Sequence, residues 1–259
     1  MKGTESPKKA LIRKNCRFVL VTFAMLSLAA QLAPIAGAAQ SSGFSIISPA
    51  AAKAQTGLNY GEWSGVWWQY VVSKPVNDPN NPLLSPTGDG CFVDQSSSRP
   101  VFFLVGAAGS GTVTRNACSV PAGKVLFFPL VNYIDLHVPG DGLDTPELVR
   151  KDLLSYIGPV NELHASIDGV AVGNLNPQST PYRACAGGAP ACSSAFSLTF
   201  PGNNLFGIPA GVYAPAVADG FYLMLAPLSP GQHTIHFGGT FFFARSKAVQ
   251  EITYNILVK

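Results

Sequence analysis

The stretch GFYLMLAPLSPGQHTIHFGGTFFF, residues 220–243, decides the fold. Residues 220–225 form a short continuous apolar run, which is typical of a buried strand. The Ser-Pro-Gly at 229–231 is a turn signal, and the residues that follow alternate between polar and apolar side chains. The stretch therefore predicts a turn that feeds a second, alternating strand over 232–243.

Similar runs lie on both sides of this stretch, at 101–105, 113–120, 124–131, 164–172, 195–200 and 251–258. Asp168-Gly169 is typical of a two-residue hairpin turn, and GAAGSG at 106–111 joins two strand-like runs. Eight to ten strands separated by turns predict a mainly β protein, an antiparallel β-sandwich or jelly roll. We expect one such domain over residues 58–259, with one or two short helices.

Two segments carry helical signals. Residues 58–72 place Trp63, Trp67 and Tyr70 on one apolar face, and Lys74-Pro75 would end that helix. Asp144 or Thr145 can cap a second helix that Gly158-Pro159 ends. The Ala- and Ser-rich segment 39–57 is predicted to be a flexible lead-in to the domain.

The first 38 residues have the order of a secretory signal peptide. Basic residues from Lys8 to Arg17 precede the apolar run FVLVTFAMLSLAA, residues 18–30, and Ala36-Gly37-Ala38 is a small-x-small cleavage site. A membrane anchor is the alternative, but a spanning helix needs about 20 apolar residues and this run is shorter. We expect a periplasmic or secreted protein that has no membrane span after cleavage.

The charge of the chain excludes a nucleic-acid partner. Residues 1–38 hold six of the 17 basic residues and one of the 14 acidic residues, so the remainder has a net charge of −2. Nucleic-acid binding needs clustered Lys and Arg, which the rest of the chain lacks.

Four cysteines follow the leader: Cys91, Cys118, Cys185 and Cys192. An even number in an oxidising compartment predicts disulfides. Three pairings are open, and we favour Cys91–Cys118 and Cys185–Cys192 because the members of each pair are close in sequence. No Cys-x-x-Cys spacing supports a zinc site.

The densest polar cluster lies at residues 132–144. Asp135, His137 and Asp141 are candidate catalytic residues, since carboxylates and an imidazole can supply a general acid and base. The same loop could bind a metal, although its spacing matches no EF-hand. A solvated loop whose last acid caps a helix is the competing interpretation.

No metal ligand is assigned elsewhere, and the sequence identifies no cofactor. His233 and His236 are three residues apart on one strand, so they face opposite sides and cannot easily share a metal. His233 lies on the face of Ile235 and Phe237, which predicts a buried or rim histidine. Tyr60 and Trp68 are candidate ligand-binding residues, because flat aromatic faces stack on sugar rings.

Three phrases together carry a resemblance: WSGVWWQY, VFFLVGAAGSGTVTRNACSVPAGKVLFFPLVN and ADGFYLMLAPLSPGQHTIHFGG. On these, the chain resembles a family of exported bacterial proteins of unassigned function. The resemblance covers most of residues 60–258 and implies one domain. The first hypothesis is a non-catalytic binding or envelope-associated protein, with a glycan as one ligand class. The alternatives are a secreted polysaccharide hydrolase or lyase, and a metal-binding exported protein.

Overall fold

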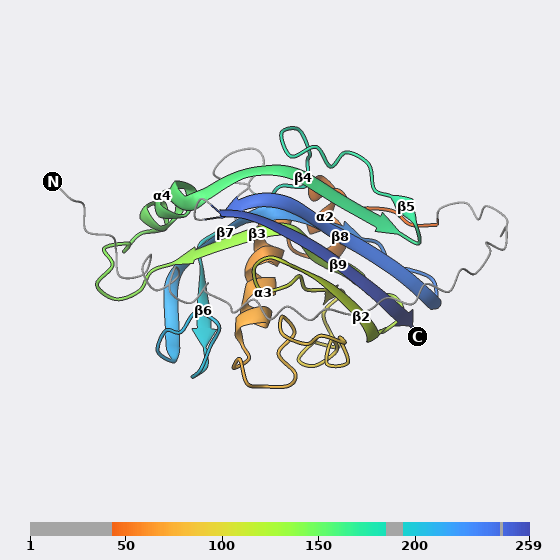
Figure 1. Cartoon of the computed structure of the whole chain (residues 1–259), viewed down its shortest axis with the longest axis horizontal. Coiled ribbons are helices and arrows are strands. Elements are labelled where there is room, and N and C mark those ends of the chain that lie inside the picture. The colour runs from red at the N-terminus through yellow and green to blue at the C-terminus, as the bar shows by residue number, and fades with distance from the viewer. Residues whose placement is uncertain (1–42, 185–193, 244–245) are drawn as a thin grey trace, which may run out of the picture.

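The computed structural model describes residues 43–184, 194–243 and 246–259 and confirms a mainly β fold of two packed sheets (Figure 1). One sheet has the order β1-β3-β7-β6 and the other β2-β9-β8-β4-β5. The strands of the first sheet are β1 (Val101–Phe103), β3 (Val125–Leu136), β6 (Phe196–Phe200) and β7 (Gly211–Leu225). Those of the second are β2 (Gly111–Val120), β4 (Ile157–Ile167), β5 (Val170–Ala171), β8 (Gly231–Phe243) and β9 (Ser246–Val258).

Most strand pairs are antiparallel, as predicted, but two are parallel. β1 pairs with β3, and β2 pairs with β9, in parallel register. Each of these pairs unites segments that no short turn connects, so turn signals along the chain gave no information about them. The Asp168-Gly169 turn between β4 and β5 is confirmed, and positive φ angles of 51° and 80° suit a type I′ hairpin.

The first sheet is covered on both faces, which explains its continuous apolar runs. One face packs against the second sheet, through residues such as Phe128, Leu223 and Phe237. The other face packs against helices α2 (Pro49–Thr56) and α3 (Tyr60–Val72), through Trp67 and Phe127 among others. A strand buried on both faces needs no polar alternation.

The outer face of the second sheet is open, and its strands alternate accordingly. Figure 1 shows β4, β8 and β9 as long strands that arch over the side of the molecule opposite α3. On β8, Ile235 and Phe237 are fully buried between the sheets, whereas Thr234 and His236 face outward. Polar side chains therefore gather on this outer face.

The two helices that the sequence predicts, over 58–72 and after residue 145, are present as α3 and α4. Asn59 caps α3, and the Glu62 side chain accepts a hydrogen bond from the Asn59 backbone in return, which completes a capping box. Helix α4 (Pro146–Tyr156) follows Thr145, whose hydroxyl accepts a hydrogen bond from the Leu148 N–H. None of the described helices is long and apolar enough to span a membrane.

The prediction of a flexible lead-in over 39–57 is wrong for residues 43–57. Ile46 forms a β-bridge with Leu225, and the Ile47 N–H donates to the Met224 carbonyl at 2.8 Å. Helix α2 then begins at a Ser48 cap and buries Ala52 completely. The segment covers the apolar outer face of the first sheet, so packing outweighs its loop-like composition. The predicted signal peptide lies outside the described residues.

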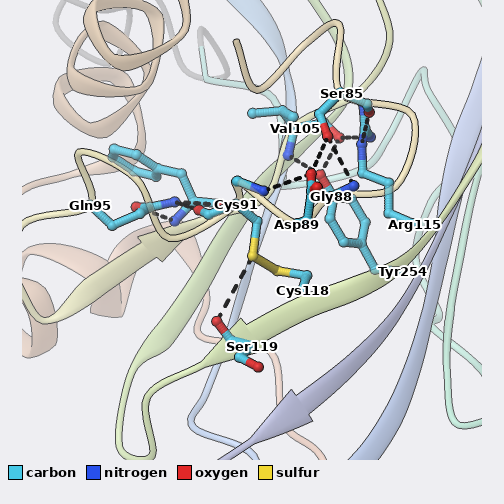
Figure 2. Close-up of a disulfide and its surroundings, with 12 residues drawn as sticks. Ser85, Gly88, Asp89, Cys91, Gln95, Val105, Arg115, Cys118, Ser119 and Tyr254 are labelled. Carbon is cyan, nitrogen blue, oxygen red and sulfur yellow. Dashed lines mark hydrogen bonds between the residues drawn. A yellow bond between two sulfur atoms is a disulfide. The ribbon is translucent and has the colours of Figure 1, made fainter. Parts of the chain in front are cut away.

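The disulfide between Cys91 and Cys118 is present and fastens the long loop after α3 to β2 (Figure 2). Cys185 and Cys192 lie outside the described residues. The fully buried Arg115 makes a second connection to the same loop, because its guanidinium donates to the Ser85 carbonyl at 3.0 Å. It also donates to the carbonyls of Val105 and Gly106, which follow β1, each at 3.0 Å. A bulge between Arg115 and Cys118 lets two residues three apart on one strand both face inward.

Candidate metal centre

Three polar side chains converge on the outer face of the second sheet from three adjacent strands: His164 on β4, His236 on β8 and Glu251 on β9. In the strand register, His164 and Glu251 both lie opposite Gly238 of the central strand, and His236 is two residues before that glycine. Residues two apart on a strand share a face. The register therefore places all three side chains around one point.

Gly238 makes this convergence feasible. A Cβ atom there would lie 3.1 Å from His164 Nε2 and 1.8 Å from the Gln250 carbonyl oxygen. Because Gly238 has no side chain, His164 and Glu251 reach across the central strand at that position. The closest polar atoms, His164 Nε2 and Glu251 Oε2, are 3.0 Å apart.

The same carboxylate oxygen binds both histidines. His236 Nε2 lies 3.2 Å from Glu251 Oε2, and the two imidazole rings stack with centroids 5.2 Å apart at an interplanar angle of 19°. One ligand atom from each of the three residues lies within 4.8 Å of the others. Two imidazole nitrogens and one carboxylate oxygen are a ligand set that zinc and other divalent transition metals use.

A further hydrogen bond holds the His236 ring. His236 Nδ1 lies 3.0 Å from the Thr253 hydroxyl, which faces it on β9. Metal-ligating histidines generally bond through their second nitrogen in this way, which fixes the ring. The hydroxyl both donates and accepts, so it suits either tautomer. The side chains of His164, His236 and Glu251 are 27%, 38% and 34% exposed, so the cluster is open to solvent.

Of the three predicted catalytic residues, His137 and Asp141 are in direct contact. Asp141 binds His137 Nδ1 at 2.8 Å and also accepts the backbone N–H groups of Val138 and Leu143. Its carboxylate thereby organises the loop. Asp135 is 1% exposed, and its Oδ1 accepts a hydrogen bond from the Leu136 N–H at 2.8 Å. A shared catalytic role for Asp135, His137 and Asp141 stays a prediction.

The two aromatic candidates for sugar stacking are buried. Tyr60 donates its hydroxyl to the Ile47 carbonyl at 2.7 Å and packs edge-on against Phe127. Trp68 packs edge-on against Trp67, with ring centroids 5.1 Å apart, and is buried as well. Both side chains are part of the layer between α3 and the first sheet, where neither ring offers an open face to a ligand.

A second histidine cluster has the composition of a Ser-His-Asp triad. His233 Nδ1 lies 2.7 Å from Asp168 Oδ2, and His233 Nε2 lies 3.5 Å from the Ser229 hydroxyl. However, Nε2 is closer to the Ser229 carbonyl oxygen, at 2.8 Å. A carboxylate and a carbonyl only accept, so both ring nitrogens donate and neither can take a proton from Ser229. We call Asp168, His233 and Ser229 the turn latch.

The pKa of His233 agrees with this structural role. Burial by itself lowers the pKa of His233, but the hydrogen bonds to Asp168 and Ser229 and the Asp168 charge outweigh it and raise the pKa above its ordinary value. The Thr234 N–H donates to the second Asp168 oxygen at 2.8 Å. The turn latch therefore joins the β4–β5 hairpin turn to the start of β8.

The strand periodicity predicts that His236 and His233 face opposite sides, and the structure has them so. The metal candidate is not evident from the sequence, because His164 and Glu251 become neighbours of His236 only through the order β9-β8-β4. The Gly238-Gly239 pair was a usable signal: glycine inside an alternating strand marks a close approach by another group.

No protein-family model and no curated protein matches the chain. Among solved structures, the solution structure of amebosin is similar over 60% of this chain and 95% of its own, at 9% identity and a TM-score of 0.18. That likeness is too low to support an argument about fold or function.

Proposed function

We propose that this protein binds a divalent transition metal through His164, His236 and Glu251. The observation that carries the proposal is the meeting of three ligand side chains from three strands over a glycine that leaves them room. The three ligand residues lie on paired strands, and the backbone hydrogen bonds between these strands hold them in place. Less conformational entropy is therefore lost when they bind a metal. The metal-binding alternative from the sequence is thus retained, with its site moved from the 132–144 loop to the sheet.

The chemistry of the donor set favours particular metals. Imidazole suits Zn²⁺, Cu²⁺ and Ni²⁺, whereas Ca²⁺ and Mg²⁺ favour all-oxygen surroundings. Without metal, His164 Nε2 lies within hydrogen-bonding distance of Glu251 Oε2, at 3.0 Å, and His236 Nε2 lies 3.2 Å from the same oxygen. A bound cation would lie between the same atoms and displace any proton that they hold.

The test is calorimetric titration of metal-free protein with Zn²⁺, Cu²⁺ and Mg²⁺, together with melting curves. We expect one equivalent of Zn²⁺ or Cu²⁺ to bind and Mg²⁺ not to bind. At a free metal concentration of about 100 Kd, linkage stabilises the fold by about 2.7 kcal/mol, which raises Tm by roughly 5–10 °C.

Glu251→Gln and His164→Ala should each abolish that rise. His137→Ala is the matched control, since it removes a part-exposed histidine that already has a carboxylate partner but lies in the loop. A rise that persists in Glu251→Gln, or one that disappears in His137→Ala, would refute the assignment.

We also propose that the chain is exported and belongs to the family of exported bacterial proteins that it resembles. The basic, apolar and small-residue order of residues 1–38 supports export, and so does the Cys91–Cys118 disulfide, since disulfides persist in oxidising compartments. Intact-mass analysis of protein from the periplasm and the medium should find a chain that begins at Ala39. Recovery of the uncleaved chain in the cytoplasm would contradict export.

A further inference from the structure

We infer that the metal centre takes up a carboxylate from solution as an additional ligand, so that the protein binds carboxylate-bearing molecules through its metal. This inference rests on the proposed metal-binding function. It starts from the fact that all three ligand residues rise from one face of one sheet. A metal bound to them has protein on one side only.

The inner side of the site is closed and supplies no donor. Directly beneath it, Phe237 and Ile252 are fully buried and belong to the core between the sheets. Within the described part of the chain, no fourth His, Cys, Asp or Glu side chain joins the three ligand atoms. Zinc sites with three protein ligands keep a position for water or substrate, whereas closed structural sites use four.

Several neighbours on the outer face are hydroxyls, which are weak ligands but good hydrogen-bond donors. Thr112 lies opposite Glu251 on β2, and Ser166 lies opposite His236 on β4. Thr240 is two residues beyond Gly238 on the same face of β8. An oxygen ligand on the metal would therefore find uncharged hydrogen-bond donors on several sides. The nearest further carboxylate on this face is that of Glu162, two residues before His164 on β4.

Charge favours an anionic donor. Two neutral imidazoles, one carboxylate and a divalent cation leave a net charge of about +1 at the centre. One more carboxylate would neutralise it. Carboxylates occur on small organic acids and at peptide C-termini, and both would present the same two oxygens to this open site.

The experiment uses Co²⁺ in the metal-free protein, because its visible ligand-field spectrum reports the atoms bound to it. Acetate, N-acetyl-triglycine and N-acetyl-triglycine amide are then titrated in. We expect a saturable change in the cobalt band with acetate and with the peptide acid. The peptide amide, which lacks only the carboxylate, should leave the band unchanged.

The experiment distinguishes failure of the carboxylate inference from failure of the metal-binding proposal. If the cobalt band forms but neither carboxylate alters it, or if the amide alters it equally, the carboxylate inference is refuted and metal binding stands. If Co²⁺ and Zn²⁺ fail to bind at all, the metal-binding proposal fails first. A response to acetate alone assigns the site to small acids, and a tighter response to the peptide acid assigns it to peptide C-termini.

Discussion

His233 and His236 lie on the same strand, three residues apart, and their surroundings give them opposite chemistry. His233 is held between the Asp168 carboxylate and the Ser229 carbonyl, so both of its nitrogens donate to fixed acceptors. His236 has a hydroxyl at Nδ1 and, at Nε2, a carboxylate that it shares with His164. The protonated ring of the first histidine has no lone pair to offer a metal, whereas the second histidine can present Nε2 to one.

The comparison shows that the identity of the second partner decides what a histidine can do. A carbonyl oxygen fixes a proton on the nitrogen that faces it, whereas a hydroxyl lets the proton move between the two ring nitrogens. Three changes test how far this difference depends on the sheet, on the hydroxyl and on the charge of the latch.

The largest effect is expected from Gly238→Ala. The added Cβ would lie 1.8 Å from the Gln250 carbonyl oxygen, and that oxygen belongs to the pairing of β8 with β9. A paired backbone carbonyl cannot move aside as the end of a flexible side chain can. We therefore expect the unfolding free energy to fall by about 3 kcal/mol, together with loss of metal binding. Urea denaturation measures the first quantity and calorimetry the second.

Gly173→Ala is the matched control for this change. A Cβ at Gly173 would have no heavy atom within 4 Å, and its φ lies outside the left-handed region. We expect its unfolding free energy to stay within about 0.5 kcal/mol of wild type. Equal stability of the two variants would show that Gly238 does not provide the room that the site needs.

The second change removes the Thr253 hydroxyl that contacts His236. Thr253→Val keeps the side-chain shape but leaves Nδ1 without its 3.0 Å partner. Loss of such a supporting hydrogen bond typically lowers metal affinity by 10- to 100-fold, and we expect about 10-fold for Zn²⁺ by calorimetry. The Tm of the metal-free variant should change little, because Thr253 is on the open face.

Thr253→Ser serves as the rescue, since it restores a hydroxyl at the same position. We expect its Zn²⁺ affinity to return to within about threefold of wild type. If valine and serine bind Zn²⁺ equally well, Thr253 does not position the His236 ring.

Local structure was predictable from the sequence, because capping residues, turn dipeptides and alternation act over a few neighbouring positions. Thr145 and Asp168-Gly169 are examples, and both mark the boundaries that the structure has. The parallel pairing of β2 with β9 was not predictable, since it joins residues more than 100 positions apart. The metal candidate depends on another distant pairing, that of β4 with β8, and the burial of Tyr60 and Trp68 depends on the packing of α3 against the first sheet.

The smallest effect is expected at the turn latch, as a dependence of stability on pH. The folded-state pKa of His233 is raised, so the protonated ring is bound more tightly in the folded state. The stabilisation is therefore complete below the unfolded-state pKa of about 6.5, and it is lost as pH rises through the folded-state value. Asp168→Asn removes the negative charge but keeps an oxygen for the Thr234 N–H, so the difference from wild type isolates the charged contact.

We expect wild type to be more stable than Asp168→Asn by about 1 kcal/mol near pH 6, with the difference shrinking toward about pH 9. Urea midpoints of the metal-free proteins across this range measure it. His233→Gln should lose the same stability at low pH. Adding Asp168→Asn to His233→Gln should then cause no further loss of stability, because the Asp168 charge no longer has a protonated ring to bind. A stability difference that stays constant with pH would mean that His233 is neutral, and the contrast with His236 would then rest on geometry alone.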